Sequence, residues 1–363
     1  MDRFLRGLLL DLDKRCQVLQ GMLREGNFHQ DLQSYSLEVY RQLEILHREI
    51  LSFLGDPALG ASALLQNQFQ QYKRLAERLH LIESYPIPFI MRYQSYDHNL
   101  FLLCTALTRQ IHYPLTVPLV AALSHEYYWT IAGFNLIYIP TGEGEFLLGL
   151  SDLCHELGHI LLLHSEAKFT GAFNSELLSY IRSEQQRVRN EQRPPEYHQF
   201  YERLFVAWKD RWTKEFVADI VATYIAGPAF GWQHLRLCAQ MSEYIFEKRL
   251  EPGMLHPSDD SRMRAILTVL RQIEHKKEAD GIAAKWNEYV TLIGDVEPTD
   301  YRLCYPDNLI HSLVNHVLNA CRDIGLRPFT DTVSDETKPN LIALMNRAWD
   351  QFFSNPESYF EAI

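Results

Sequence analysis

The segment SDLCHELGHILLLH, residues 151–164, places two histidines and a glutamate close together in an otherwise apolar stretch. Its apolar residues recur at the spacing of a helix, so we predict a buried helix here. Burying two imidazole rings and a carboxylate in apolar surroundings is costly unless the three groups share a partner. The rest of the chain must therefore fold so that this helix receives such a partner.

The spacing of these polar residues fits a metal site. His155 and His159 are four residues apart, so they lie on one helix face and can both reach one ion about 2 Å away. Glu156 lies one position round the helix, where it can reach a water on that ion without becoming a third helix ligand. The pattern is typical of a zinc site with a glutamate as general base, which a purely structural zinc site does not need. The alternative is a buried helix whose histidines only form hydrogen bonds.

A catalytic zinc ion needs a third protein ligand and leaves its fourth position to water. The candidates that follow in the sequence are His164, Glu176 and Glu215. His164 does not fit the metzincin pattern, because that pattern needs a glycine and a histidine at the positions held by Leu162 and Ser165. Two glutamates therefore remain as candidates.

Glu215 is favoured over Glu176 by the residue one helical turn after each. Asp219 follows Glu215 and can accept the outer N–H of a ligand histidine, which fixes the orientation of the ring. Tyr180 follows Glu176 and offers no carboxylate. The neighbours of Glu215 are mostly apolar, as expected for a buried ligand. Glu176 stays open as the alternative, with a spacing near that of thermolysin-type enzymes.

Three motifs resemble the gluzincin metallopeptidases, and especially the family that contains the HtpX-type heat-shock proteases and the CAAX prenyl proteases. They are HELGH at 155–159, EFVAD at 215–219 and HPSDDSRM at 256–263, in the order of that family. The resemblance covers roughly residues 130–270. The chain departs from the best-known members, which are embedded in membranes, because no spanning helix is expected in it. The helical flanks have no counterpart in that family that we can assign.

The resemblance implies a zincin-like domain that hydrolyses peptide bonds with one zinc ion. It assigns the ligands to His155, His159 and Glu215. It also implies that Glu156 is the general base and that His256 or Arg262 lies near the scissile carbonyl. Judged from the sequence around them, His256 is equally a helix-start histidine beside a proline. Arg262 fits an ion pair with Asp219 or another acid better than it fits an oxyanion donor.

The fold class is predicted as mainly α (α+β), with a small sheet and active-site helices. We divide the chain into an N-terminal helical region at 1–110, a zincin-like domain at 111–275 and a C-terminal helical region at 276–363. Within the first region, apolar residues at helical spacing predict a hairpin of two helices, at about 32–54 and 65–84.

Strands and further helices are predicted around the motifs. The stretch YYWTIAGFNLIYIPTGEGE is rich in aromatic and β-branched residues and predicts two short strands, with a turn at Gly142 and Gly144 that leads into the active-site helix. Substrate is expected to add as a strand along an edge at about 134–139. Helical periodicity covers about 146–164, 201–226 and 258–275, the last with Ser258 as N-cap.

Net charge, apolar content and cysteine content limit the partners and the location of the protein. A net charge of −11 argues against a nucleic-acid partner, which normally requires a basic stripe. The most apolar long window, 115–140, contains His125, Glu126 and two prolines, so we expect no membrane insertion. The six cysteines form no CxxC pair, which fits a reducing compartment, and we predict a cytoplasmic protein.

Two function classes follow from these observations. The first is a zinc endopeptidase that acts on protein or peptide substrates, with helical flanks that keep it latent or bind a regulatory partner. The second is a zinc-stabilised binding or scaffold protein with a peptidase-like fold and no turnover. Glu156 beside the ligands favours the first class. Zinc hydrolysis of a small amide is a third possibility. A closed pocket would indicate that activity, and an open groove would indicate protein substrates.

Overall fold

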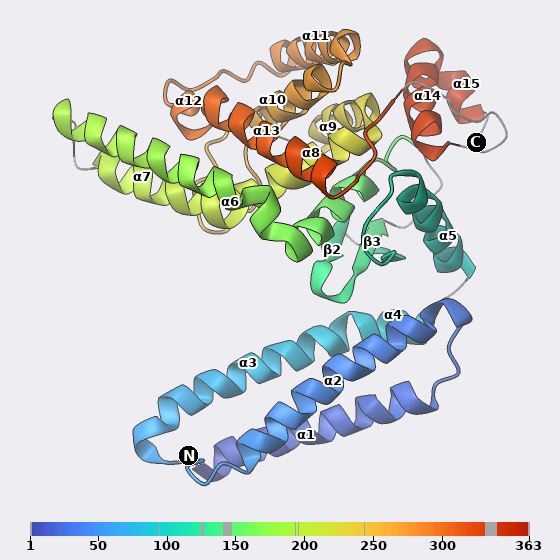
Figure 1. The fold of residues 1–363 in the computed structure, drawn as a ribbon, viewed down its shortest axis with the longest axis vertical. Coiled ribbons are helices and arrows are strands. Elements are labelled where there is room, and N and C mark those ends of the chain that lie inside the picture. Colours follow the sequence, from blue (N-terminus) through green and yellow to red (C-terminus); the bar gives the residue numbers. More distant parts are fainter. Residues whose placement is uncertain are drawn as a thin grey trace. The chain divides into compact units, whose positions relative to one another are not determined.

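Helices make up most of the chain in the computed structural model, and the strands form one small sheet (Figure 1). The structure describes residues 2–93, 95–124, 127–140, 147–192, 194, 196–242, 244–330 and 340–361. The predicted fold class, mainly α with a small sheet, is confirmed. The chain divides into two compact units, Met1–Asn99 and Leu100–Ile363. The predicted division into three regions remains a prediction.

The first unit is built on three long helices that contact one another (Figure 1): α1 (Asp2–Glu25), α2 (Gln33–Leu54) and α3 (Leu65–Ser84). The two helices predicted from apolar spacing are present as α2 and α3. Among the apolar residues that predicted them, Leu43 in α2 and Leu79 in α3 are fully buried. The unit also contains η1 (Gln30–Leu32), η2 (Ser62–Leu64), α4 (Pro86–Arg92) and the first residues of α5 (Ser95–Gln110).

The sheet in the second unit has the strand order β1-β3-β2. The strands are β1 (Leu119–Ser124), β2 (Trp129–Ile131) and β3 (Leu136–Pro140), and η3 (Ala132–Phe134) lies between the last two. β3 pairs in parallel with β1 and antiparallel with β2. The predicted substrate edge at 134–139 is therefore wrong, because β3 is the central strand and is paired on both sides. The predicted turn at Gly142 and Gly144 lies outside the described residues.

The three motifs lie on or beside three helices of the second unit. HELGH is in α6 (Asp152–Asn190), EFVAD is in α8 (Thr213–Ala226), and the third motif runs into α10 (Asp259–Gln272). The backbone of α6 is not helical at Ser165, where φ is −142° and ψ is 29°. The Ser258 side chain accepts a hydrogen bond from the backbone N–H of Ser261, which confirms the predicted N-cap.

Further helices make up the rest of the second unit. The helix predicted at 201–226 is in fact divided: it comprises part of α7 (Glu196–Ala207), a π-helical turn (Trp208–Trp212) and α8. The others are α9 (Pro228–Met241), α11 (Lys276–Ile293), α12 (Tyr301–Cys304), α13 (Asp307–Asp323), α14 (Leu341–Ser354) and α15 (Pro356–Glu361). Helix α13 packs against both α6 and α8, so it covers the helices that carry the first two motifs.

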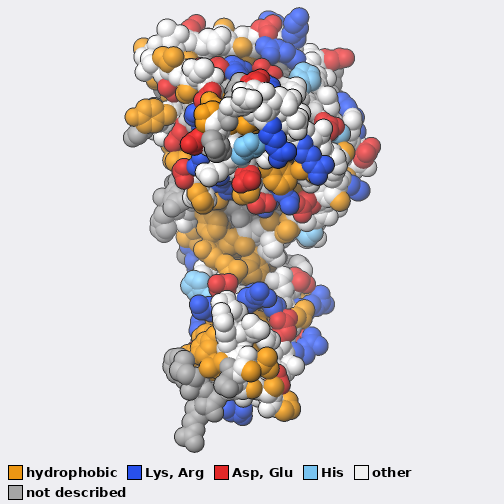
Figure 2. All heavy atoms as spheres, turned by 90° about the vertical axis from the view of Figure 1, so that its left-hand side faces the viewer, with side chains coloured by type: hydrophobic (Ala, Val, Ile, Leu, Met, Phe, Trp, Pro, Cys, Tyr) orange, Lys and Arg blue, Asp and Glu red, His pale blue; other side chains and the backbone are white. Residues whose placement is uncertain are grey.

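Two further sequence predictions concern a nucleic-acid partner and membrane insertion. On the face that Figure 2 shows, acidic and basic side chains are intermixed among the described residues. Among the described helices, none reaches the combination of length and apolar character that a bilayer crossing requires. His125 and Glu126, on which the prediction of no membrane insertion depends, lie outside the described residues.

Helices α6 and α8 approach each other closely at Gly158. A Cβ atom at Gly158 would lie 2.8 Å from the Cα of Ala218 and 3.2 Å from its carbonyl oxygen. The contact atoms belong to the backbone, which cannot move aside as the end of a flexible side chain can. Because Gly158 lies within HELGH and Ala218 within EFVAD, this contact sets the two motifs face to face.

We expect Gly158→Ala to destabilise the fold by about 1–3 kcal/mol, because the new methyl group forces two packed helices apart. Gly171→Ala is the matched control, since Gly171 lies in the same helix with open space around it. It should leave stability unchanged or raise it by about 0.5–1 kcal/mol, because alanine restricts the unfolded chain. Urea unfolding measures both. Equal stability of the two variants would show that α6 and α8 are not in close contact.

Candidate metal centre

Helices α6 and α8 bring three metal-binding side chains together. His155, His159 and Glu215 each offer one ligand atom, and these atoms all lie within 4.8 Å of one another. The two Nε2 atoms are 3.1 Å apart, and the Glu215 carboxylate oxygens lie 3.6 Å from Nε2 of His155 and 3.5 Å from Nε2 of His159. A tetrahedral ion separates its ligand atoms by about 3.4 Å, because its bonds are about 2.0–2.1 Å long. The arrangement therefore fits a metal ion.

The histidine pair differs in its preference for a proton. Burial lowers the pKa of both rings, but for His155 the carboxylates of Asp219 and Glu215 outweigh burial and raise the pKa to about 10. The pKa of His159 is lowered to about 4. One positive charge is thus favoured among these side chains. A metal ion can take the place of that proton, because metal binding displaces protons from its ligands.

Asp219 lies behind His155. Its Oδ1 lies 2.9 Å from Nδ1 of His155, on the other side of the ring from the Nε2 that faces the ligands. Arg262 donates from Nε and Nη2 to the two carboxylate oxygens of Asp219, each at 2.7 Å. Burial opposes ionisation, but Arg262 and His155 hold the pKa of Asp219 well below its usual value. The structure thus brings Arg262 to Asp219, in agreement with the ion pair considered from the sequence.

A cavity of about 1120 Å³ is lined by the three candidate ligands. Strand β2 contributes Trp129 and Thr130 to its wall. Further wall residues are apolar or aromatic and more than half exposed: Leu163 (55%), Met241 (62%), Tyr244 (62%) and Leu255 (59%). The cavity is therefore open to solvent rather than enclosed.

Glu156 lies in the wall of this cavity and is only 4% exposed. Its Oε2 is buried and has no hydrogen-bond partner within the described ranges. Burial raises the pKa of Glu156 to about 8; His155 opposes this rise, and the carboxylates of Glu215 and Asp152 add to it. A buried carboxylate oxygen without a partner is costly in a protein. A group that acts on a bound molecule is one explanation for such an oxygen.

Two other candidates from the sequence, His256 and Glu176, differ in outcome. His256 lies at the cavity, with Nδ1 2.8 Å from Oε2 of Glu215, and its side chain is 54% exposed. Glu176, the alternative ligand, is bound to α13 instead. Its carboxylate accepts a hydrogen bond from the hydroxyl of Ser312 and lies 2.8 Å from Nε2 of His316. The structure therefore brings Glu215, and not Glu176, to the histidine pair.

One polar group at the cavity was missed in the sequence. Asp152 and Tyr127 both line the cavity, and the Tyr127 hydroxyl donates a hydrogen bond to the Asp152 carboxylate. Gln233 donates to the same carboxylate from Nε2 at 2.6 Å. Burial outweighs these bonds and raises the pKa of Asp152 to about 6. A signal was available, since Asp152 precedes His155 by three residues and so lies on the same helix face.

Asp219→Ala is expected to lower the free energy of unfolding by about 3–5 kcal/mol, because it leaves the Arg262 charge buried without its partner. The double variant Asp219→Ala/Arg262→Met removes both charges and should recover most of that loss. Glu288→Ala, at the exposed Lys285–Glu288 pair, is the control and should unfold at the wild-type urea concentration. If Asp219→Ala is as stable as this control, the buried pair does not form.

Comparisons with known proteins leave the site to be interpreted from its own geometry. No family model matches the chain, and neither a curated protein nor a solved structure gives a significant match.

Proposed function

We propose that the chain is a zinc metallopeptidase, with His155, His159 and Glu215 as ligands and Glu156 as general base. The observation that carries the proposal is the buried, unpartnered carboxylate oxygen of Glu156 beside three converging ligand atoms in a cavity wall. A metal site that only stabilises a fold is closed by four protein ligands and has no use for such a carboxylate. The resemblance of the three motifs to the gluzincin peptidases supports the same assignment.

The donor set determines the metal proposed. Two imidazole nitrogens and one carboxylate are ligands that suit zinc and leave a fourth position open. The chemistry that zinc supplies when bound is polarisation of a carbonyl oxygen and a lower pKa for water. We assign to Asp219, 2.9 Å from Nδ1 of His155, the role of orienting this ring so that Nε2 faces the other ligands. Arg262 holds Asp219 in turn and so acts as a positioning residue.

Proton transfer is assigned to Glu156. The carboxylate takes a proton from the attacking water and delivers it to the amine that leaves when the peptide bond breaks. This role requires an ionised carboxylate at neutral pH, and a cation held by the neighbouring ligands would lower the raised pKa of Glu156. His256 is half-exposed beside Glu215 and is proposed to donate a hydrogen bond to the substrate.

The cavity favours a polypeptide over a small amide as substrate. Small-molecule pockets have volumes of about 300–1000 Å³ and bury most of their ligand. This cavity is larger and is open along exposed apolar residues. We place an extended segment beside the edge strand β2, where backbone hydrogen bonds give affinity without strong sequence preference. A regulatory partner for the helical flanks remains a prediction.

A cytoplasmic location is part of the proposal. All six cysteines are free and buried, which agrees with a reducing compartment. The free, buried state of these cysteines supports a reducing compartment and says nothing about the reaction.

The test of function is chelator-sensitive proteolysis. The purified full chain should cleave casein, an unstructured protein substrate. 1,10-Phenanthroline should abolish this cleavage, and added zinc should restore it, because the ligands bind a removable ion. Cleavage that continues unchanged in the chelator contradicts a metal mechanism. A zinc-loaded chain that cuts neither casein nor peptides supports the scaffold protein instead.

A further inference from the structure

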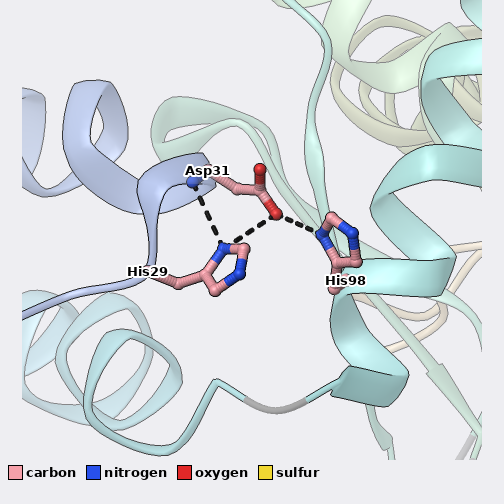
Figure 3. Close-up of side chains that lie close together, drawn as sticks. All are labelled: His29, Asp31 and His98. Carbon is pink, nitrogen blue, oxygen red and sulfur yellow. Dashed lines mark hydrogen bonds and ion pairs between the residues drawn. The ribbon is translucent and has the colours of Figure 1, made fainter.

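A second cluster of metal-binding side chains lies within the first unit. His29 precedes η1, Asp31 lies in η1, and His98 lies in α5. One ligand atom from each residue falls within 4.8 Å of the others. Figure 3 shows the two imidazole rings directed at one carboxylate, although the histidines are far apart in sequence.

Three polar groups converge on a single oxygen of Asp31. Nδ1 of His29 lies 3.1 Å from Oδ2, and Nδ1 of His98 contacts the same atom. The Tyr93 hydroxyl also donates a hydrogen bond to Oδ2, at 3.0 Å. One carboxylate oxygen has two lone pairs, so three hydrogen-bond donors exceed what it can accept. At least one ring nitrogen is therefore not well placed as a donor.

The backbone identifies which nitrogen this is. The N–H of Asp31 donates to Nδ1 of His29 at 3.4 Å, so this nitrogen acts as an acceptor and carries a lone pair. That lone pair faces the Asp31 oxygen 3.1 Å away. Two acceptors at this distance repel each other unless a proton or a metal ion lies between them. Within the described ranges, the ion pairs of Asp31 are with the two histidines, and no Lys or Arg supplies the charge.

Ions can reach this cluster from solvent. The side chain of His29 is 51% exposed and that of His98 is 33% exposed. A third cluster in the chain, formed by His234, Cys238 and Asp259, is fully buried. Its carboxylate already accepts hydrogen bonds from Arg249 at 3.0 Å and Ser242 at 2.7 Å. An arginine beside the carboxylate opposes a second cation, so the third cluster is less suited to a metal.

We propose that His29, Asp31 and His98 bind a divalent transition-metal ion of the zinc class, independently of the proposed peptidase site. Imidazole nitrogens select zinc, copper, nickel or cobalt over magnesium and calcium, which prefer oxygen ligands. Tyr93 orients the Asp31 carboxylate by its hydrogen bond. The bound ion links η1 to α5, two segments of the first unit that the sequence separates by 67 residues.

Zinc stoichiometry of the full chain tests the proposal. The chain is stripped with a chelator, equilibrated with zinc and dialysed, and the metal is measured by atomic absorption. Wild type should hold about two zinc ions, one for each three-ligand site, and His29→Ala should hold about one. His80→Ala removes another exposed histidine from the first unit and should keep both ions. Tyr93→Phe should weaken binding by about 10–100-fold, as expected for loss of an orienting partner.

The outcomes separate the two sites. If wild type holds about one ion that His29→Ala keeps and Glu215→Ala loses, the proposed site in the first unit is overturned and the peptidase site stands. If the single ion is lost in His29→Ala and kept in Glu215→Ala, the metal site in the first unit stands and the peptidase site fails. Asp31→Asn keeps the size of the side chain and should repeat the His29→Ala result. Thermal unfolding of the metal-free variants confirms that each one folds.

Discussion

Glu215→Ala is expected to remove zinc from the second unit. The carboxylate spans both histidines, with one oxygen 3.6 Å from His155 and the other 3.5 Å from His159. Without it, two neutral imidazoles must hold a dication at the cavity wall with no negative ligand. Loss of an orienting partner alone weakens metal sites by about 10–100-fold, so loss of a ligand should exceed about 100-fold. Competition with a chromophoric zinc chelator measures the affinity.

Glu176→Ala is the matched control for this prediction. Glu176 is the same residue type and the other candidate from the sequence, but its carboxylate is bound to Ser312 and His316 of α13. Its removal should leave zinc affinity at the wild-type value. The reverse result, with zinc lost in Glu176→Ala and kept in Glu215→Ala, would place the metal elsewhere. Glu215→Gln preserves the shape of the side chain and separates loss of the charged ligand from loss of packing.

The site in the second unit could be predicted because its geometry follows from helical repeats. Residues four apart on a helix share a face, so the sequence alone places His155 beside His159 and Asp219 one turn after Glu215 on the same face. The small residues Gly158 and Ala218 then permit the two helices to meet on those faces. Each of these rules is local. The contact between α6 and α8 is tertiary, and the sequence pointed to it through the resemblance of the motifs rather than through spacing.

The sheet shows where such local rules end. The run LVAALS in β1 is short and apolar, and periodicity cannot distinguish a strand of this kind from a helical segment. Without β1, β3 looked like a free edge. Pairing between β1 and β3 depends on contacts across the chain, which the spacing within either strand does not encode. The π-helical turn Trp208–Trp212 was missed for a related reason, because the predicted helix assumed one period throughout.

The cluster in the first unit could not be predicted at all. His29 and His98 belong to segments with no shared motif, and no spacing rule connects them. The packing of the first unit brings η1 and α5 together, and only then does Asp31 lie between the two rings. His256 is a different case, because the motif resemblance implied a place near the site, but its contact with Glu215 joins a loop residue to a helix residue and follows from no spacing rule. Such sites depend on the tertiary fold.

Glu156→Gln is expected to lower turnover by a factor of at least about 100, the usual contribution of a placed general base. The amide has the shape of the carboxylate but cannot accept the proton. Zinc content should not change, because the ligand atoms come from other residues. Glu166→Gln is the matched control, since Glu166 lies in the same helix and lines the same cavity but is exposed. This control should cleave casein at the wild-type rate.

The most direct test of the account is therefore the rate of casein cleavage by wild type and Glu156→Gln at equal measured zinc content. The two proteins should have equal zinc content and equal thermal stability, and the rate should be at least about 100-fold lower in the variant. Equal cleavage rates in the two proteins would contradict the assignment of Glu156 as general base, and with it the proposed metallopeptidase mechanism.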